Sequence, residues 1–448
     1  MANRSSISPS RLVLIALGAF GSSTILAQPV AIAAILLGIV ALITAIVTGK
    51  RLDAGPKGSD KRTIFGLIVI FSILLIAGPT HEVYGSAPSW LLPAEGAAWL
   101  ILGFSWLVTR SVTARRVVFV LVLSATGVFG IIHLANVADF GLDVFWLHES
   151  AADAIASGSS PYSDAVTVPN GAPEGDSFIV GYPYPPVTAL SYSIGSWLGD
   201  ARWTSLVAWL ITLAIVGAKS LSGVRSELPL GVMLASAAIP GWPLVLTSAW
   251  SEPLSLALLS IATLLWSKPR LFGMGAGLFF GSKQYLLASA PLMLTSKVSQ
   301  RWARAMWASI ALTISFLPIL IWGIPDFIEA AIGFHLEAPL RTDGSSLIGL
   351  LSALGAERTW TPPLWLVGAV ALVLAVVLGR NVTSPIRWLT ALAAILATAA
   401  FLSSQALSNY WFLIAGISAL TAGMRSTTAS PETTPNASET RLAHRSAS

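Results

Sequence analysis

Long apolar stretches alternate with short polar segments along almost the whole chain. A helix of about 20 apolar residues crosses a bilayer core of about 30 Å. Strand-like alternation over about ten residues is absent, which argues against a transmembrane barrel. The pattern therefore predicts an all-α, polytopic transmembrane helical bundle of about 11–14 spans. The apolar stretches are 12–27, 30–48, 63–78, 90–108, 117–137, 184–199, 203–218, 229–248, 253–267, 271–295, 306–324, 363–379, 388–403 and 409–424.

Three of these stretches allow two interpretations. The 184–199 stretch is short, rich in serine and preceded by prolines, so it either spans the membrane or lies at its interface. The 271–295 stretch contains Lys283 and forms either one helix or a tight hairpin around that lysine. The first stretch has the features of a signal peptide, but a second one follows directly after Gln28, which favours a retained helical hairpin over cleavage.

The composition supports a membrane protein and excludes two other classes. Of 448 residues, 54% are hydrophobic and only 10% are charged, with a mean hydropathy of +0.75. A soluble protein of this size needs far more charge to cover its surface, and a disordered chain needs lower hydrophobicity. Cysteine is absent, which excludes disulfides, thiolate metal sites and cysteine nucleophiles.

The positive charges indicate an orientation. Lysine and arginine concentrate in cytoplasmic loops, which also explains the net charge of +5 without any nucleic-acid partner. The segments predicted to be cytoplasmic are 49–62, 110–116, 297–304 and 380–387. We therefore expect a multi-pass protein of the cell (plasma) membrane.

This orientation divides the chain into three parts. Residues 1–110 are predicted to be an N-terminal extension of four spans. Residues 111–424 form the main membrane domain, with exoplasmic loops at 138–182 and 325–344. Residues 425–448 are rich in Ser, Thr, Ala and Pro and are predicted to be a disordered cytoplasmic tail.

One region breaks the apolar pattern. Residues 117–201 contain no lysine or arginine but eight acids. The loop 138–182 within this region is the longest polar loop between spans, and such loops often carry function. Near-helical spacing of apolar residues over 143–157 predicts an amphipathic helix on the bilayer surface, ended by Gly158. The prolines of 181–186 predict a rigid, aromatic start to the next span.

Several short motifs follow one another in a recurrent order. An Asp and an aromatic residue precede the surface helix, Gly158-x-x-Pro161-Tyr162 follows it, and Tyr184-Pro185-Pro186 opens a span. Further along are Gly281-Ser282-Lys283-Gln284-Tyr285 with Pro291, then Phe334–Arg341, then Ser345–Gly349. In this order and hydropathy context, residues 117–424 resemble the polyprenyl-phosphate-mannose-dependent mannosyltransferases of bacteria, within the C-type membrane glycosyltransferase superfamily.

The sequence departs from that family in one place. Where many relatives show Gly-Gln-x-Asn, this chain has Ser248-Ala249-Trp250-Ser251-Glu252. The substrate preference linked to that motif is therefore not carried over. The donor sugar, the acceptor, the linkage and the oligomeric state are not determined by the sequence.

The resemblance implies sugar transfer from a polyprenyl phosphate to an acceptor hydroxyl outside the cytoplasm. Such a reaction needs a carboxylate to take the hydroxyl proton, but no second acid, because the leaving phosphate is stable as an anion. Asp143 matches the family's aspartate and is the predicted general base. Asp139, one helical turn away, is the alternative candidate for the general base. In a second interpretation, neither acid is catalytic and both are solvated loop residues or helix caps.

Three cationic or hydrogen-bonding residues are candidates for the donor phosphate. Arg341 suits bidentate contact with phosphate and His335 can donate a hydrogen bond, unless Arg341 is an exposed loop charge or pairs with a nearby acid. Lys283 lies between two apolar stretches, where a charge is costly and usually functional. Alternatively, the Lys283 side chain extends along the apolar surface and places its ammonium group at the membrane interface, which is known as snorkelling.

Tyr182, Tyr184, Trp146 and Glu252 are candidate contacts to the sugar or the acceptor. The aromatic residues equally suit a membrane-interface belt, and Glu252 equally suits a simple loop acid. His148 is interpreted as an interfacial histidine, and Glu149 with Asp153 as a solvated helix face. Histidines are few and scattered, so neither a metal nor another cofactor is predicted.

Three functions fit these features. The first is an integral membrane glycosyltransferase, most simply a mannosyltransferase, whose partners are a polyprenyl-phosphate-linked sugar donor, a glycan or glycolipid acceptor of the cell envelope, and the bilayer. The second is a transporter or flippase for a lipid-linked or anionic solute, which should carry polar residues on broken helices near the bilayer midplane. The third is a non-catalytic assembly scaffold. Because the polar residues concentrate in loops, the sequence favours the enzyme.

Overall fold

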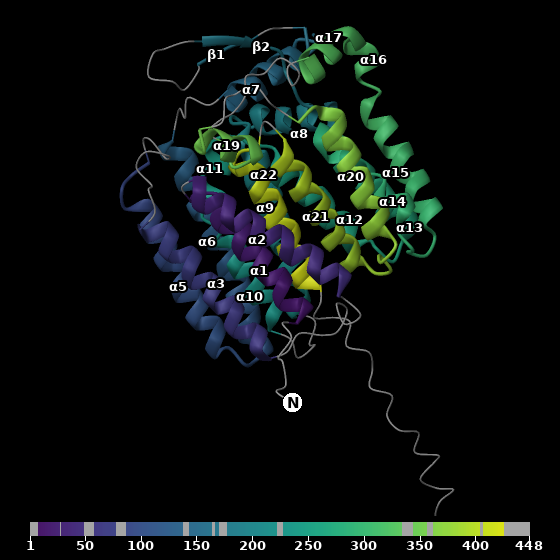
Figure 1. The fold of residues 1–448 in the computed structure, drawn as a ribbon. Coiled ribbons are helices and arrows are strands. Elements are labelled where there is room, and N and C mark those ends of the chain that lie inside the picture. Colours follow the sequence, from purple (N-terminus) through teal and green to yellow (C-terminus); the bar gives the residue numbers. More distant parts are fainter. Residues whose placement is uncertain are drawn as a thin grey trace, which may run out of the picture.

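The chain folds into a helical bundle with one small β-hairpin (Figure 1). The computed structural model describes residues 8–26, 28–48, 58–77, 87–137, 143–163, 166–169, 177–221, 227–333, 344–355, 362–403 and 406–424. The α-helices are α1 (Pro9–Ser23), α2 (Gln28–Val47), α3 (Gly58–Ala77), α5 (Leu91–Val108), α6 (Val112–Asn136), α7 (Asp143–Ala156), α8 (Pro186–Trp197), α9 (Arg202–Ala218), α10 (Leu228–Ala237), α11 (Trp242–Thr247), α12 (Glu252–Leu264), α13 (Pro269–Ser282), α14 (Leu292–Thr295), α15 (Arg301–Phe316), α16 (Ile319–Trp322), α17 (Ile324–Ile328), α19 (Leu347–Ala353), α20 (Leu364–Gly379), α21 (Pro385–Leu402) and α22 (Ser408–Met424).

Five short elements complete the fold. The 3-10 helices η1 (Lys219–Leu221) and η2 (Gln284–Ser289) follow α9 and α13, and the π-helical turn η3 (Glu329–Gly333) follows α17. The strands β1 (Val166–Pro169) and β2 (Ser177–Val180) pair antiparallel, with Val166 opposite Val180. The hairpin lies beside α7 at the end of the molecule opposite the N-terminus (Figure 1).

The predicted helical bundle is confirmed, with a more limited set of full-length helices. Five helices of the described residues are long and apolar enough to cross a membrane, or up to six if the bent pair α8 and α9 is one span. Several other apolar stretches form shorter helices or break in two, as α10 and α11 do on either side of Pro240. The count of 11–14 came from apolar length alone, which does not detect such breaks.

The two uncertain stretches of the middle region are both interrupted. The 184–199 stretch forms the short helix α8, and the chain then bends by 109° into α9. The 271–295 stretch is not one helix: α13 ends at Ser282, Lys283 is extended, and η2 and α14 follow. Helices α13 and α15 run parallel, since Gly273 adjoins Arg304 and Gly277 adjoins Ala308. The segment between them must therefore return to its starting side, as the hairpin interpretation predicts.

Glycines allow α13 and α15 to approach closely. A Cβ atom at Gly273 would lie 2.4 Å from the carbonyl oxygen of Arg304, and one at Gly277 would lie 2.3 Å from that of Ala308. Spacing of small residues by four positions is the usual way in which membrane helices bring their backbones together. This contact fixes α13 against α15 and so sets the height at which Lys283 leaves the helix.

The N-terminal helices are part of the same packed body as the C-terminal ones. Helix α1 packs against α2 and α22, and α2 packs against α21. Phe20 of α1 stacks on Trp411 of α22 with ring centroids 5.9 Å apart. The Gln28 side chain donates a hydrogen bond of 2.9 Å to the carbonyl of Gly344. The N-terminal helices therefore support the rest of the bundle directly.

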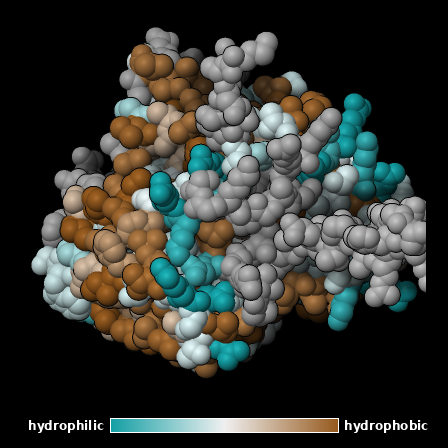
Figure 2. All heavy atoms as spheres, turned by 90° about the horizontal axis from the view of Figure 1, so that it is seen from below, coloured by the Kyte–Doolittle hydropathy of each residue, from teal (hydrophilic) through white to brown (hydrophobic). Residues whose placement is uncertain are grey.

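Charged segments gather in two places that the sequence assigned to the cytoplasm. The Lys61 ammonium group contacts the Glu227 carboxylate and the carbonyl of Leu107. It therefore joins the start of α3 to the end of α5 and the start of α10. The backbone N–H of Lys297 donates a hydrogen bond to the carbonyl of Val382. This bond joins the basic segments 297–304 and 380–387. Seen from below, hydrophilic side chains lie beside broad hydrophobic areas (Figure 2). Exposed apolar side chains such as Val40, Ile101 and Ile321 suit contact with lipid.

We predict that Gly277→Ala destabilises the protein, because its methyl group would overlap the backbone of α15. Overpacking of this kind costs about 1–3 kcal/mol. The measurement is thermal unfolding in detergent. Gly127→Ala in α6 is the matched control, because a Cβ there meets nothing within 4 Å and alanine favours a helix over glycine. Equal unfolding temperatures for the two variants would contradict the close packing of α13 on α15.

Candidate functional site

Helix α7 forms as predicted and packs by one face onto the bundle. It begins at Asp143, and the chain leaves it through Gly158, whose φ of +76° favours glycine. Leu147, His148 and Ala151 are buried on its inner face. Trp146 is 39% exposed and stands against Phe145 on the outer side of the helix. Trp146 is therefore not brought together with the other candidate residues.

A cluster of aromatic side chains holds α7 onto α8. His148 is wholly buried and stacks on Tyr192 with ring centroids 3.9 Å apart, and on Tyr184 at 5.3 Å. Its Nδ1 atom and the Tyr182 hydroxyl are joined by a hydrogen bond of 3.0 Å. The Tyr162 hydroxyl donates to the carbonyl of Tyr184 at 3.0 Å. The interpretation of His148 as an interfacial residue is wrong, because the turn after the hairpin covers it completely.

Beneath this cluster, Lys283 and Glu252 form a buried ion pair. The ammonium group of Lys283 donates to Glu252 Oε1, and the two side chains are only 6% and 0% exposed. The same Oε1 atom accepts a hydrogen bond of 2.8 Å from the Asn409 amide and one of 3.3 Å from the Tyr285 hydroxyl. Thus Lys283 does not snorkel to the interface, and Glu252 is not a loop acid but the first residue of α12.

Three tyrosine rings surround the ammonium group of Lys283. The ring centroids of Tyr184, Tyr285 and Tyr410 lie 5.4, 5.6 and 5.8 Å from Nζ. Ring faces attract a cation, and the attraction is stronger where water is excluded. All three tyrosines are partly exposed. The rings therefore stabilise the charge and also mark the side from which a ligand can approach it.

The ends of four helices meet at this ion pair. Glu252 begins α12, Asn409 lies in the first turn of α22, and Tyr184 precedes α8 by two residues. Helix N-termini carry partial positive charge and favour anions. Ser282, the last residue of α13, connects these helices: its carbonyl accepts from Thr188 at 2.5 Å, and its hydroxyl lies 2.8 Å from that of Ser255. Serine and threonine side chains thus fix the break before Lys283.

The charge of Asp143 acts on the same tyrosine as the ion pair. Burial, then the Asp143 carboxylate, then Glu252 raise the pKa of Tyr184 well above its usual range. Asp143 is half-buried at the start of α7. The charges of the predicted base on α7 and of the predicted phosphate ligand Lys283 therefore both act on Tyr184. Asp139, His335 and Arg341 lie outside the described residues, and their roles remain predictions.

Two acids predicted to form a solvated face of α7 behave differently. Asp153 is exposed as expected. Glu149 instead accepts hydrogen bonds from the Ser196 hydroxyl and, at 2.8 Å, from the backbone N–H of Ala201. The prediction for Glu149 is wrong because the 109° bend between α8 and α9 brings unpaired donors to this carboxylate.

Arg202 is a site residue that sequence reasoning missed. Its guanidinium pairs with both oxygens of Asp200 and donates a hydrogen bond of 2.5 Å to the carbonyl of Val137. It also lies 4.9 Å from the ring centroid of Phe145. Arg202 thus holds the end of α6 and the start of α7, on either side of residues 138–142. The available signal was its position as the first arginine after the acid-rich region.

Asn409, Tyr285 and Tyr410 were also missed. Tyr410 stacks on Tyr285 with centroids 4.5 Å apart, and Asn409 bonds to Glu252, which is 157 positions away in the sequence. Asn409-Tyr410 is a polar pair at the start of an apolar stretch, a pattern that an interfacial belt produces equally well. Only the fold distinguishes the two cases.

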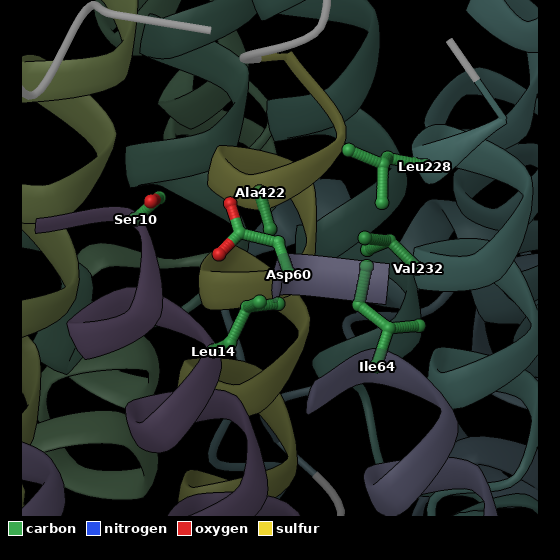
Figure 3. A pocket seen from close by; sticks show the side chains of 7 residues that line it. All are labelled: Ser10, Leu14, Asp60, Ile64, Leu228, Val232 and Ala422. Atoms are coloured by element: carbon green, nitrogen blue, oxygen red, sulfur yellow. The ribbon is translucent and has the colours of Figure 1, made fainter. Parts of the chain in front are cut away.

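Neither metal-ligating groups nor the small cavity of Figure 3 provides a second site in the described part of the chain. Within the described residues, no group of three or more His, Asp or Glu side chains is arranged to hold a metal ion. A cavity of about 20 Å³ lies among α1, α3, α10 and α22, with Ser10 and Asp60 on one side and Ile64, Leu228 and Val232 on the other (Figure 3). Such a volume suits about one water molecule and not a substrate. The Asp60 carboxylate is 3.8 Å from the Arg11 guanidinium, which gives it a structural role.

The comparisons with known proteins identify no relative. No family model, no curated protein and no solved structure matches the chain.

We predict that Lys283→Met strongly destabilises the protein, because it leaves the Glu252 carboxylate buried without its cation. Breaking one partner of a buried pair typically costs about 3–5 kcal/mol. Adding Glu252→Gln should recover part of the loss, since both charges are then removed. Thermal unfolding of the single and double variants in detergent tests this. If Lys283→Met alone unfolds at the wild-type temperature, the ion pair is not structurally important.

A second prediction concerns the stability of the protein at low pH. Burial, and then the charge of Lys283, lower the pKa of His148 from 6.5 to about 3. Between these values the unfolded chain binds a proton at His148 that the folded protein does not bind, so the free energy of unfolding falls as the pH falls. The expected slope is about 1.4 kcal/mol per pH unit.

The comparison for this slope is His148→Gln, which keeps a hydrogen-bonding side chain but does not titrate. Both proteins are unfolded by denaturant between pH 6.5 and 4.5, and the carboxylates contribute equally to each. The wild type should lose stability more steeply by about the slope given above. Identical slopes would mean that His148 takes up its proton in the folded state.

Proposed function

We propose that this protein is an integral membrane glycosyltransferase that moves a sugar, most simply mannose, from a polyprenyl phosphate to a hydroxyl of a cell-envelope glycan or glycolipid. In this proposal the protein is a multi-pass protein of the plasma membrane. The end that carries α7 faces the exoplasmic side, and the basic loops face the cytoplasm. The apolar helices with exposed apolar side chains support the membrane location.

The observation that carries the proposal is the convergence of a carboxylate and a buried cation on Tyr184. The Asp143 carboxylate, at the start of α7, acts electrostatically on Tyr184. The Lys283 Nζ atom lies 5.4 Å from the centroid of the Tyr184 ring. The two groups match the two needs of the reaction, which are a proton acceptor for the nucleophile and a positive charge for the leaving group.

The reaction balances with these two groups alone. The acceptor hydroxyl oxygen attacks the anomeric carbon of the sugar, and its proton passes to the Asp143 carboxylate. The bond between the anomeric carbon and the phosphate oxygen breaks, and polyprenyl phosphate leaves as an anion. Attack from the side opposite the leaving group inverts the anomeric configuration. Because the phosphate is a stable anion, no acid has to protonate it.

Electrostatics at Lys283 suit the departing phosphate. The ammonium group is buried, so its interaction with an anion is stronger than it would be in water. The N-termini of α8, α12 and α22 lie around it and add partial positive charge. In the proposal, His335 and Arg341 add donors to the same phosphate, and the partly exposed Tyr184 lines the sugar side. Tyr182 is buried against His148 and supports Tyr184 from within.

We predict that Asp143→Asn reduces transfer by at least about 100-fold while binding of the donor lipid persists, because the amide cannot accept the proton. The assay uses the purified protein in vesicles supplied with polyprenyl phosphomannose and envelope glycolipid acceptor. Asp153→Asn is the matched control, since Asp153 lies exposed on the same helix. Transfer by Asp143→Asn at the wild-type rate would exclude Asp143 as the base.

The alternative function is a transporter or flippase, and one observation favours it. Lys283, Glu252 and Asn409 form a buried polar cluster at the ends of broken helices, which is the arrangement expected at a transport site. This reverses the expectation that polar residues concentrate only in loops. Movement of labelled polyprenyl phosphomannose across sealed vesicles without acceptor, unchanged in Asp143→Asn, would favour the transporter.

A further inference from the structure

The two oxygen atoms of the Glu252 carboxylate differ in their hydrogen bonding. Its Oε1 atom accepts hydrogen bonds from Lys283, Asn409 and Tyr285. Its Oε2 atom is buried and has no hydrogen-bond partner among the described residues. The Asn409 amide has the same asymmetry: Nδ2 donates to Glu252 at 2.8 Å, whereas Oδ1 is buried and unpartnered. A buried polar atom without a partner is costly, so two in one hydrogen-bonded pair indicate a missing ligand.

The chemistry of the two oxygens restricts that ligand. A carboxylate oxygen and an amide oxygen accept hydrogen bonds and cannot donate them. A phosphate anion also offers only acceptors, so it cannot satisfy them. A group with hydroxyls can, since each hydroxyl donates one hydrogen bond. The hydroxyls of Ser248 and Ser251, on the turn that leads into Glu252, are also buried without partners.

This turn is held rigidly. Ala249 has a φ of +55°, a conformation that costs free energy for a residue with a side chain and persists only where the surroundings impose it. The Tyr192 hydroxyl lies 2.7 Å from that of Ser205 and donates a hydrogen bond of 2.9 Å to the carbonyl of Trp250. The turn is buried throughout. The acceptors of Glu252 and the serines are thus held in fixed positions before any ligand arrives.

We propose that Glu252 and Asn409 recognise hydroxyl groups of the sugar and so distinguish a sugar-bearing lipid phosphate from the same lipid phosphate without its sugar. This inference rests on the proposed function, in which Lys283 binds the phosphate. One carboxylate joins both halves of the site, because Oε1 contacts Lys283 while Oε2 is left for a hydroxyl. The partly exposed rings of Tyr184, Tyr285 and Tyr410 offer apolar faces to the ring of the sugar.

The test compares two lipids with the same polyprenyl chain, polyprenyl phosphomannose and polyprenyl phosphate. Their equilibrium binding to the purified full-length protein is measured in detergent. Asn409→Leu removes the amide with little change in volume. Ser418→Ala is the control, since the Ser418 hydroxyl lies in the same helix and bonds only to the carbonyl of Ile414. Asn409→Ala, which removes the amide and leaves the Lys283–Glu252 ion pair in place, is the second variant should Asn409→Leu not fold.

We expect the wild type to bind the sugar-bearing lipid more tightly than the sugar-free lipid. Asn409→Leu should weaken binding of the sugar-bearing lipid by about tenfold or more, while binding of the sugar-free lipid changes by less than about twofold. Asn409→Ala should reduce the same preference. Ser418→Ala should leave both affinities unchanged.

Two results would overturn the inference. Equal loss of both lipids in Asn409→Leu would mean that the amide only supports Lys283, and an unchanged preference would mean that the acceptors do not meet the sugar. Failure of the proposed function gives a different result, because the wild type would then transfer no sugar to the acceptor, whatever its preference between the two lipids. If the wild type transfers sugar but binds the two lipids equally, the proposed function stands and the sugar site at Glu252 and Asn409 is excluded.

Discussion

The rest of the described site depends on one buried ion pair, between Lys283 and Glu252, within an apolar bundle. Removing two charges from water is expensive, and attraction between them repays the cost only with further hydrogen bonds. The protein supplies these hydrogen bonds through Asn409 and Tyr285, and three tyrosine rings lie around the ammonium group. Each partner comes from a different segment, so the pair can exist only when α12, α22 and the hairpin after α13 are assembled together.

The position of Lys283 follows from the packing of helices rather than from the lysine itself. Glycines in α13 bring its backbone against that of α15, and the two helices run parallel. The chain must therefore break and return between them, and the break occurs at Lys283. Arg202 fixes both ends of the segment between α6 and α7, and with them the position of Asp143 at the start of α7. Two unrelated packing constraints thus position a carboxylate and an ammonium group whose charges both act on Tyr184.

Part of the site was predictable because it depends on local signals. The Asp143 helix has apolar residues at helical spacing and a glycine after its end. The Lys283 segment stood out because a charge between apolar stretches is costly. Asn409 and Arg202 gave no comparable signal, since a polar residue at the start of a span and an arginine in a loop are common. The burial of His148 depends on the turn after the hairpin, and the bonded state of Glu149 depends on the bend between α8 and α9. No periodicity encodes either feature.

Hydropathy alone indicated a helical bundle with helices long and apolar enough to cross a membrane, because about 20 apolar residues in a helix satisfy every backbone group without water. It also indicated where helices form, since that depends on the neighbours along the chain. It did not determine which apolar stretches run unbroken, or which polar side chains meet. Glu252 and Asn409 are 157 positions apart and Lys283 lies between them. Only the tertiary structure decides their meeting, because it depends on the close approach of helix backbones and on the cost of leaving a buried charge unpaired.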